Sequence, residues 1–180
     1  MVLPWNTVIA GVYPGTFDPP TVAHLAVARA ARRHAGLERI DLVVSQVGLG
    51  KEPDGVTPAP LRARRLVEAT KTLPWLQVRV TDKQLIADIA AGYDAVILGA
   101  DKWSQINDPS WYGSSEARDA ALGRLPRVLV APRSPFPLPV GKAEALDVDE
   151  AYWEVSSTAV RDGRWEWRVG PPEDTRVDPG

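Results

Sequence analysis

Short apolar runs alternate with amphipathic segments along this chain, and this alternation limits its fold more than any other feature. The runs have the length of strands and are rich in β-branched residues. They cover residues 7–13, 40–44, 76–80, 94–99 and 128–131. Because most of these runs lack polar residues at alternate positions, they indicate parallel strands that are buried on both faces of a sheet.

Amphipathic helices are predicted between these strands. They cover residues 22–35, 61–73, 84–91 and 114–122. In the first helix Arg29 and Arg32 share one face, Val27 and Ala31 share the opposite one, and Gly36 stands where a helix-ending glycine belongs. Strands that alternate with helices predict an α/β fold, here a doubly wound Rossmann-like parallel sheet with helices on both faces. Ligands bind such sheets at the carboxyl ends of the strands.

Composition limits the organisation and the function of the chain. With 180 residues, a single domain over residues 1–168 is expected, followed by a flexible tail over 169–180. A formal net charge of -2 argues against a nucleic-acid binder, which needs basic groups to neutralise phosphates. No apolar run is long enough to span a membrane, no secretory signal is recognisable, and the absence of cysteine excludes disulfides. A cytoplasmic protein is therefore expected, and a homo-oligomer is left open.

The turn after the first predicted strand is the first candidate site. Gly15 lets a phosphate approach the backbone, and the turn leads into a helix N-terminus, where free N–H groups favour an anion. Thr21 and His24 lie on the same side of that helix start and are expected to face a bound phosphate. The structural alternative is a helix cap at Thr21 and a histidine without function. The position after strand one favours the ligand site.

A second candidate site begins near residue 156. Ser156 is expected to cap a helix, and Ser157 and Thr158 can offer hydroxyls and backbone N–H groups to an anion. Arg161 follows one turn later with a forked guanidinium. Taken alone, a capped helix start followed by an arginine is a common structural pattern.

Together the two segments resemble the two signature motifs of the nucleotidyltransferase superfamily. The first is similar to GxFDPxHxGH or its TxGH version, with matches at Gly15, Phe17, Asp18, Pro19, Thr21 and His24. The second is similar to ISSTxIR, with valine in place of both isoleucines. Thr21 stands where many members have histidine, and Ala23 replaces the usual glycine. The resemblance extends over residues 8–161.

The resemblance implies a role for each motif in binding ATP. His24 and Thr21 are expected to contact the phosphates of ATP and to stabilise the charge that develops at the α-phosphate. Ser157, Thr158 and Arg161 are expected to hold the β- and γ-phosphates. Residues of the first turn complete the expected ATP site, namely Gly15, Thr16 and Phe17. Mg²⁺ is expected to arrive with ATP, with no metal site built from protein side chains.

The middle of the chain holds looser matches. Gly99 and Asp101 belong to a Gly-Ala-Asp sequence that resembles one in nicotinate- and nicotinamide-mononucleotide adenylyltransferases, where the aspartate binds ribose hydroxyls. A capping aspartate is the alternative. Trp103 and Trp111 are expected in a loop, where they stack on a pyridine or adenine ring or anchor the loop to the core. Lys51 falls where that branch often has a lysine, so a catalytic role over the phosphates is expected for it, with a solvated loop lysine as the alternative. The proline-proline-histidine sequence of that branch does not precede it.

The expected activity is transfer of AMP from ATP to a small phosphorylated acceptor with release of pyrophosphate. The expected acceptor is nicotinate mononucleotide or its amide, in NAD biosynthesis. Phosphopantetheine adenylylation, cytidylyl transfer to a phosphorylated alcohol, and an inactive nucleotide-binding relative are the alternatives. The chain departs most from its relatives after Arg161, where Trp165 and Trp167 alternate with charged residues instead of continuing a helix. A sheet edge, a dimer contact and a core cap are all compatible with that pattern.

Overall fold

The computed structural model describes residues 8–46 and 57–170. In this part of the chain a parallel sheet has the strand order β3-β2-β1-β4-β5-β6. Its strands are β1 (Ala10–Gly15), β2 (Arg39–Ser45), β3 (Leu76–Thr81), β4 (Ala95–Gly99), β5 (Arg127–Ala131) and β6 (Ala143–Ala145). The order reverses between β1 and β4, which places a topological switch point there. The predicted doubly wound α/β fold is confirmed.

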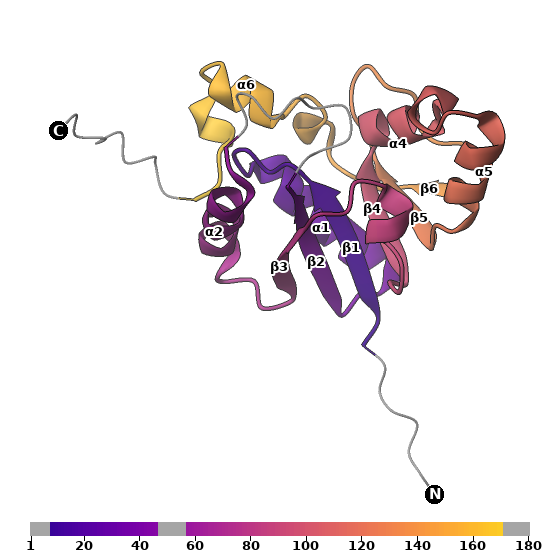
Figure 1. Cartoon of the computed structure of the whole chain (residues 1–180). Coiled ribbons are helices and arrows are strands. Elements are labelled where there is room, and N and C mark those ends of the chain that lie inside the picture. The colour runs from indigo at the N-terminus through magenta and orange to yellow at the C-terminus, as the bar shows by residue number, and fades with distance from the viewer. Residues whose placement is uncertain (1–7, 47–56, 171–180) are drawn as a thin grey trace, which may run out of the picture.

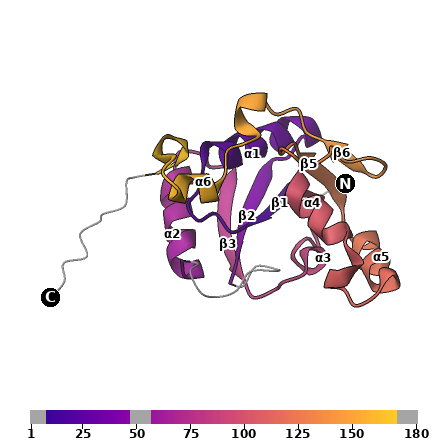
Figure 2. The same cartoon turned by 90° about the horizontal axis from the view of Figure 1, so that it is seen from above.

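Helices cover both faces of the sheet (Figures 1 and 2). They are α1 (Val22–Ala35), α2 (Ala59–Thr70), α3 (Ile86–Ile89), α4 (Ala100–Asn107), α5 (Ser115–Gly123) and α6 (Ser157–Arg161), with 3-10 turns η1 (Pro109–Trp111), η2 (Glu150–Tyr152) and η3 (Trp165–Trp167). Among the described residues, no helix is long and apolar enough to cross a membrane.

Two core clusters show why β4 is apolar throughout. In β4, Ile97 packs into a cluster with α1 and α2, whereas Val96 and Leu98 pack into a second cluster with α3 and α4. Successive side chains therefore enter opposite cores, because side chains alternate between the two faces of a strand. Both faces need apolar residues, as the sequence predicted.

Several boundaries differ from those predicted. β1 runs through Pro14 to Gly15, although a break was expected at the proline. Pro14 pairs with Val43 of β2, whereas the ladder to β4 covers only Gly11 and Val12. Since no strand pairs with Pro14 on that second side, its missing N–H is tolerated there. α3 is shorter than predicted, and the edge strand β6 was not predicted.

The segment after α6 returns to the carboxyl edge of the sheet. Arg168 forms an antiparallel bridge with Thr21, and the N–H of Val169 donates to the carbonyl of Pro20 at 3.0 Å. Val169 was expected to begin the flexible tail, and residues 171–180 lie outside the described residues. The start of α1 is thus bonded to a segment more than a hundred residues away in sequence.

Candidate active site

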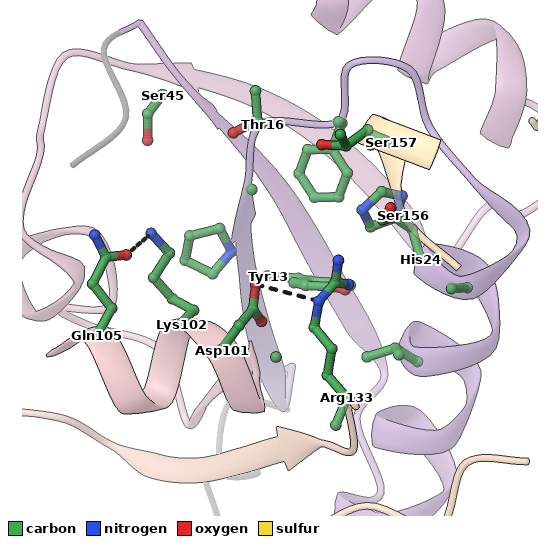
Figure 3. A pocket seen from close by; sticks show the side chains of 18 of the residues that line it. Tyr13, Thr16, His24, Ser45, Asp101, Lys102, Gln105, Arg133, Ser156 and Ser157 are labelled. Atoms are coloured by element: carbon green, nitrogen blue, oxygen red, sulfur yellow. Dashed lines mark hydrogen bonds and ion pairs between the residues drawn. The ribbon is translucent and has the colours of Figure 1, made fainter. Parts of the chain in front are cut away.

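A cavity of about 890 Å³ opens at the carboxyl ends of β1, β4 and β5. It lies at the switch point and is within the size range of about 300–1,000 Å³ that is typical of small-molecule sites. Figure 3 shows side chains from β1, α1, α4 and α6 around it. Most of the predicted site residues line it, namely Gly15, Thr16, Phe17, His24, Gly99, Asp101, Trp111, Ser157, Thr158 and Arg161.

His24 is fixed in one tautomer by the start of its own helix. The backbone N–H of Thr21 donates to Nδ1 of His24 at 2.9 Å. A backbone N–H can only donate, so Nδ1 carries no proton and the ring proton lies on Nε2. Burial, helped by the positive charge of Arg133, lowers the pKa of His24 to about 4. At neutral pH the ring is therefore uncharged and keeps Nε2–H as its donor.

Thr21 supports His24 instead of facing the cavity. It is the N-cap of α1, its side chain is fully buried, and its Oγ1 lies 3.0 Å from Nδ1 of His24. It is not among the residues that line the cavity. The cap that was the structural alternative is present, and the expected contact between Thr21 and a phosphate does not follow from this geometry.

Gly15 and Phe17 shape the turn that precedes α1. Phe17 adopts a positive φ of 50°, and its buried ring lies edge-on to His24 with 4.9 Å between centroids. A Cβ on Gly15 would lie 2.7 Å from Cζ of Phe17. Glycine is therefore needed here for packing against the phenyl ring, a reason in addition to the expected approach of a phosphate.

The second motif is bonded to the first. Ser156 caps α6 as predicted, since its Oγ accepts from the N–H of Ala159 at 3.0 Å. The hydroxyl of Ser157 donates to the carbonyl of Pro19 at 2.7 Å. The guanidinium of Arg161 donates to the carbonyl of Asp18 and, at 3.1 Å, to Oγ1 of Thr158. Two segments that are far apart in sequence therefore form one wall of the cavity.

Asp101 enters the cavity from the first turn of α4. A Cβ on Gly99, the N-cap of that helix, would collide with Oδ1 of Asp101, so glycine permits this position of the carboxylate. Oδ2 of Asp101 pairs with Nε of Arg133 at 3.4 Å (Figure 3). Arg133 was not predicted. It could have been found from its position just after β5, because ligands bind such sheets at the carboxyl ends of the strands.

The two tryptophans of the middle segment differ in position. Trp103 lies in α4 and packs against the second core cluster, so the loop predicted for it is wrong. It does not line the cavity, and its role in binding an acceptor stays a prediction. Trp111 ends η1, is 39% exposed and lines the cavity together with Phe136. Lys51 lies outside the described residues.

Lys102 brings another cation to the wall of the cavity. It lies beside Asp101 on α4, and its Nζ donates to Oε1 of Gln105 at 2.5 Å (Figure 3). Together with Arg133 and Arg161 it surrounds the cavity with positive charge. The site therefore favours anionic ligands although the whole chain has a formal net charge of -2.

Arg62 joins the first turn to the neighbouring elements. Its side chain is buried, and it donates to three backbone carbonyls, of Thr57 at 2.6 Å, Thr16 at 2.8 Å and Ser45 at 2.8 Å. Burial lowers its pKa, and the nearby Asp18 carboxylate opposes this effect. The burial of Arg62 was not predicted from the sequence.

The site offers few ligands for a metal ion held by protein alone. Among residues 8–46 and 57–170, no group of three or more histidine or acidic side chains is arranged to hold one. Mg²⁺ is commonly bound by one or two carboxylates together with water and substrate phosphates. Asp101 and Asp108 are the acidic side chains among the residues that line the cavity, so the residues present fit an ion that arrives with a nucleotide.

Comparison with known proteins is consistent with this site. Residues 12–163 match the cytidylyltransferase-like family. The probable nicotinate-nucleotide adenylyltransferase of Treponema pallidum is 28% identical over 192 residues, which cover 89% of this chain and 92% of that protein. The protein of the same name from Coprothermobacter proteolyticus is 26% identical over 174 residues, covering 89% and 85%.

A solved structure resembles the fold. It is nicotinic acid mononucleotide adenylyltransferase of Plasmodium falciparum in complex with NaAD, with a TM-score of 0.61 and 16% identity, over 85% of this chain and 82% of that one. At this identity the likeness concerns the fold alone. The family match spans both motifs and nearly all of the described residues. The chain belongs to the cytidylyltransferase-like family of nucleotidyltransferases.

Proposed function

We propose that this protein is a nicotinate-nucleotide adenylyltransferase, which transfers AMP from ATP to nicotinate mononucleotide and releases pyrophosphate. The observation that carries the proposal is the joining of the two motifs. Arg161 and Ser157 bond to the carbonyls of Asp18 and Pro19, next to His24. This arrangement suits a triphosphate that runs from α1 to α6. The names of the relatives from Treponema and Coprothermobacter favour nicotinate mononucleotide as acceptor.

The chemistry is an in-line displacement at the α-phosphorus of ATP. A phosphate oxygen of the acceptor forms the new P–O bond, and the bond to the bridging oxygen of the β-phosphate breaks. Nε2–H of His24 donates to a non-bridging oxygen of the α-phosphate, where negative charge develops. Because the ring is neutral and already oriented, this hydrogen bond needs neither proton transfer nor reorganisation. Arg161 holds the departing pyrophosphate, and no covalent enzyme intermediate forms.

Mg²⁺ is part of the proposal as an ion that enters with ATP. When bound, it neutralises part of the charge on the phosphates. Asp101 is the side chain placed to approach it, and it is already paired with Arg133. The aspartate is also placed to accept hydrogen bonds from ribose hydroxyls, as the family resemblance implies.

The acceptor is proposed to lie between α4, η1 and the loop after β5. Trp111 and Phe136 both line this part of the cavity and can stack on a pyridine ring. Lys102 and Arg133 also line the cavity and can pair with the phosphate and the carboxylate of nicotinate mononucleotide. A neutral carboxamide would gain less from these cations. We also propose that the reaction takes place in the cytoplasm.

Pyrophosphate release across a panel of substrates tests the proposal. ATP and CTP are each combined with nicotinate mononucleotide, nicotinamide mononucleotide, phosphopantetheine and a phosphorylated alcohol. The highest kcat/KM is expected for ATP with nicotinate mononucleotide, with the dinucleotide identified by mass. Preference for another pair of nucleotide and acceptor would assign the enzyme to another branch of the nucleotidyltransferases. Tight binding of ATP without turnover of any acceptor would identify an inactive relative.

A further inference from the structure

The segment that follows α6 lies directly against the start of α1. We call residues 164–170 the C-terminal strap, and Figure 1 shows it in yellow above α2 and beside α6. Arg168 bridges to Thr21, and Val169 N–H donates to the carbonyl of Pro20 at 3.0 Å. These backbone contacts reach the two residues that precede α1, the helix that carries His24.

The strap is fixed at both ends. At its beginning, the N–H of Arg164 donates to the carbonyl of Ala159 in α6 at 2.9 Å. At its end, a Cβ on Gly170 would lie 3.5 Å from Cβ of Ala69 in α2. The strap therefore connects α6 to α2 across the start of α1.

The strap and the second motif hold the same turn from two directions. The carbonyls of Asp18 and Pro19 accept hydrogen bonds from α6. The carbonyl of Pro20 accepts one from the strap, and Thr21 pairs with Arg168 in an isolated antiparallel bridge. The N–H of Thr21 is also the donor that fixes Nδ1 of His24. Any shift of the backbone at Thr21 therefore changes the hydrogen bond that selects the tautomer of the ring.

We propose that the C-terminal strap is a positioning element of the active site. It fixes the backbone of Pro20 and Thr21, and thereby keeps the proton of His24 on Nε2, toward the cavity. Its consequence for turnover depends on the proposed function, whereas its consequence for the histidine ring does not. The two parts can therefore be tested separately.

Val169→Pro tests the proposal and Val169→Ala is its matched control. Proline removes the N–H that donates to Pro20, whereas alanine shortens the side chain and keeps the donor. Arg168 has ψ 145°, which suits a residue before proline. The chain has two histidines, so ring ¹⁵N spectra of the full-length protein resolve His24 with His34 as an internal reference.

In the unaltered protein and in Val169→Ala, His24 should show an unprotonated Nδ1 and a protonated Nε2. In Val169→Pro the two ring nitrogens should move toward averaged values, because the hydrogen bond that selects the tautomer is weakened. The signals of His34 should stay unchanged. We expect kcat to fall about 10-fold while KM for ATP changes little, because alignment is lost and the phosphate-binding groups remain.

Unchanged His24 signals in folded Val169→Pro would overturn the proposal. If that variant does not fold, Gly170→Val decides in its place. It keeps every backbone donor but puts a branched side chain at a φ of 103°, which displaces the strap from α2. His24 signals like those of the unaltered protein in Gly170→Val would then refute the positioning role. A lack of turnover in the unaltered protein would refute the proposed function alone.

Discussion

His24 has two properties that determine its response to pH. Its Nδ1 accepts a hydrogen bond from Thr21 N–H, and its pKa is lowered to about 4 by burial and by Arg133. Protonation of the ring is therefore opposed in the folded protein. In the unfolded chain the pKa returns to 6.5, so the unfolded chain binds a proton that the folded protein excludes until about pH 4.

Stability should consequently fall as the pH drops from 6.5 to about 4, and this contribution should be fully present above pH 6.5. Urea unfolding at pH 7 and pH 4.5 measures the effect. The variant His24→Gln cannot titrate and should lose less stability over the same interval. Equal losses in both proteins would show that other groups dominate the acid response.

His24 and Thr21 should differ in their effects on turnover. His24→Ala removes the donor proposed for the α-phosphate and should lower kcat by about 100-fold or more. Thr21→Val removes a buried hydroxyl but keeps the backbone N–H on Nδ1, so kcat should fall less than about 10-fold. Steady-state kinetics with His34→Ala as control measures both. A larger loss of kcat in Thr21→Val would indicate that Thr21 contacts the ligand after all.

At the scale of elements, Arg62 of α2 joins segments next to β1 and β2. It donates to the carbonyls of Thr16, which follows β1, of Ser45, which ends β2, and of Thr57, which precedes α2. Arg62→Met should remove three buried hydrogen bonds to backbone carbonyls and lower the free energy of unfolding by about 3 kcal/mol. Arg64→Met, on an exposed position of the same helix, should change it by less than about 0.5 kcal/mol. Urea unfolding measures the free energy of unfolding of both variants. Equal losses would show that Arg62 does not stabilise the junction of these elements.

Some of these elements could be predicted from the sequence and others could not. Central strands such as β4 were predicted because each buries both faces, which leaves a continuous apolar run. The edge strand β6 has three residues and no comparable run. Trp103 was placed in a loop because polar residues and a proline follow it, although the helix continues to Asn107.

Some site residues could likewise be predicted from the sequence, whereas others could not. His24, Ser157 and Arg161 could be predicted because a local motif at a helix start carries each of them. The burial of Arg62 depends on carbonyls from three separate segments, and the ion pair between Arg133 and Asp101 depends on adjacent strands. Such contacts arise from the tertiary fold and leave no periodic signal in the sequence.

At the scale of the whole molecule, the cavity lies between the two halves of the sheet. One wall comes from the turn after β1, and the others come from α4, the segment after β5 and α6. A triphosphate bound there, as proposed, would contact both halves, and a ligand that binds only the folded protein stabilises it. At 100 times its Kd, ATP should stabilise the folded state by about 2.7 kcal/mol and raise the Tm accordingly.

Pyrophosphate alone should give part of this rise in Tm, because Arg161 is proposed to bind the departing pyrophosphate. Arg161→Ala should lose most of the rise with pyrophosphate, because the guanidinium that reaches Thr158 and the turn at Asp18 is gone. Arg29→Ala, on the exposed face of α1, should keep it. Differential scanning fluorimetry with each ligand makes the comparison. An undiminished rise in Arg161→Ala would mean that the departing phosphates bind elsewhere, and the joining of the two motifs would then serve the fold without serving the reaction.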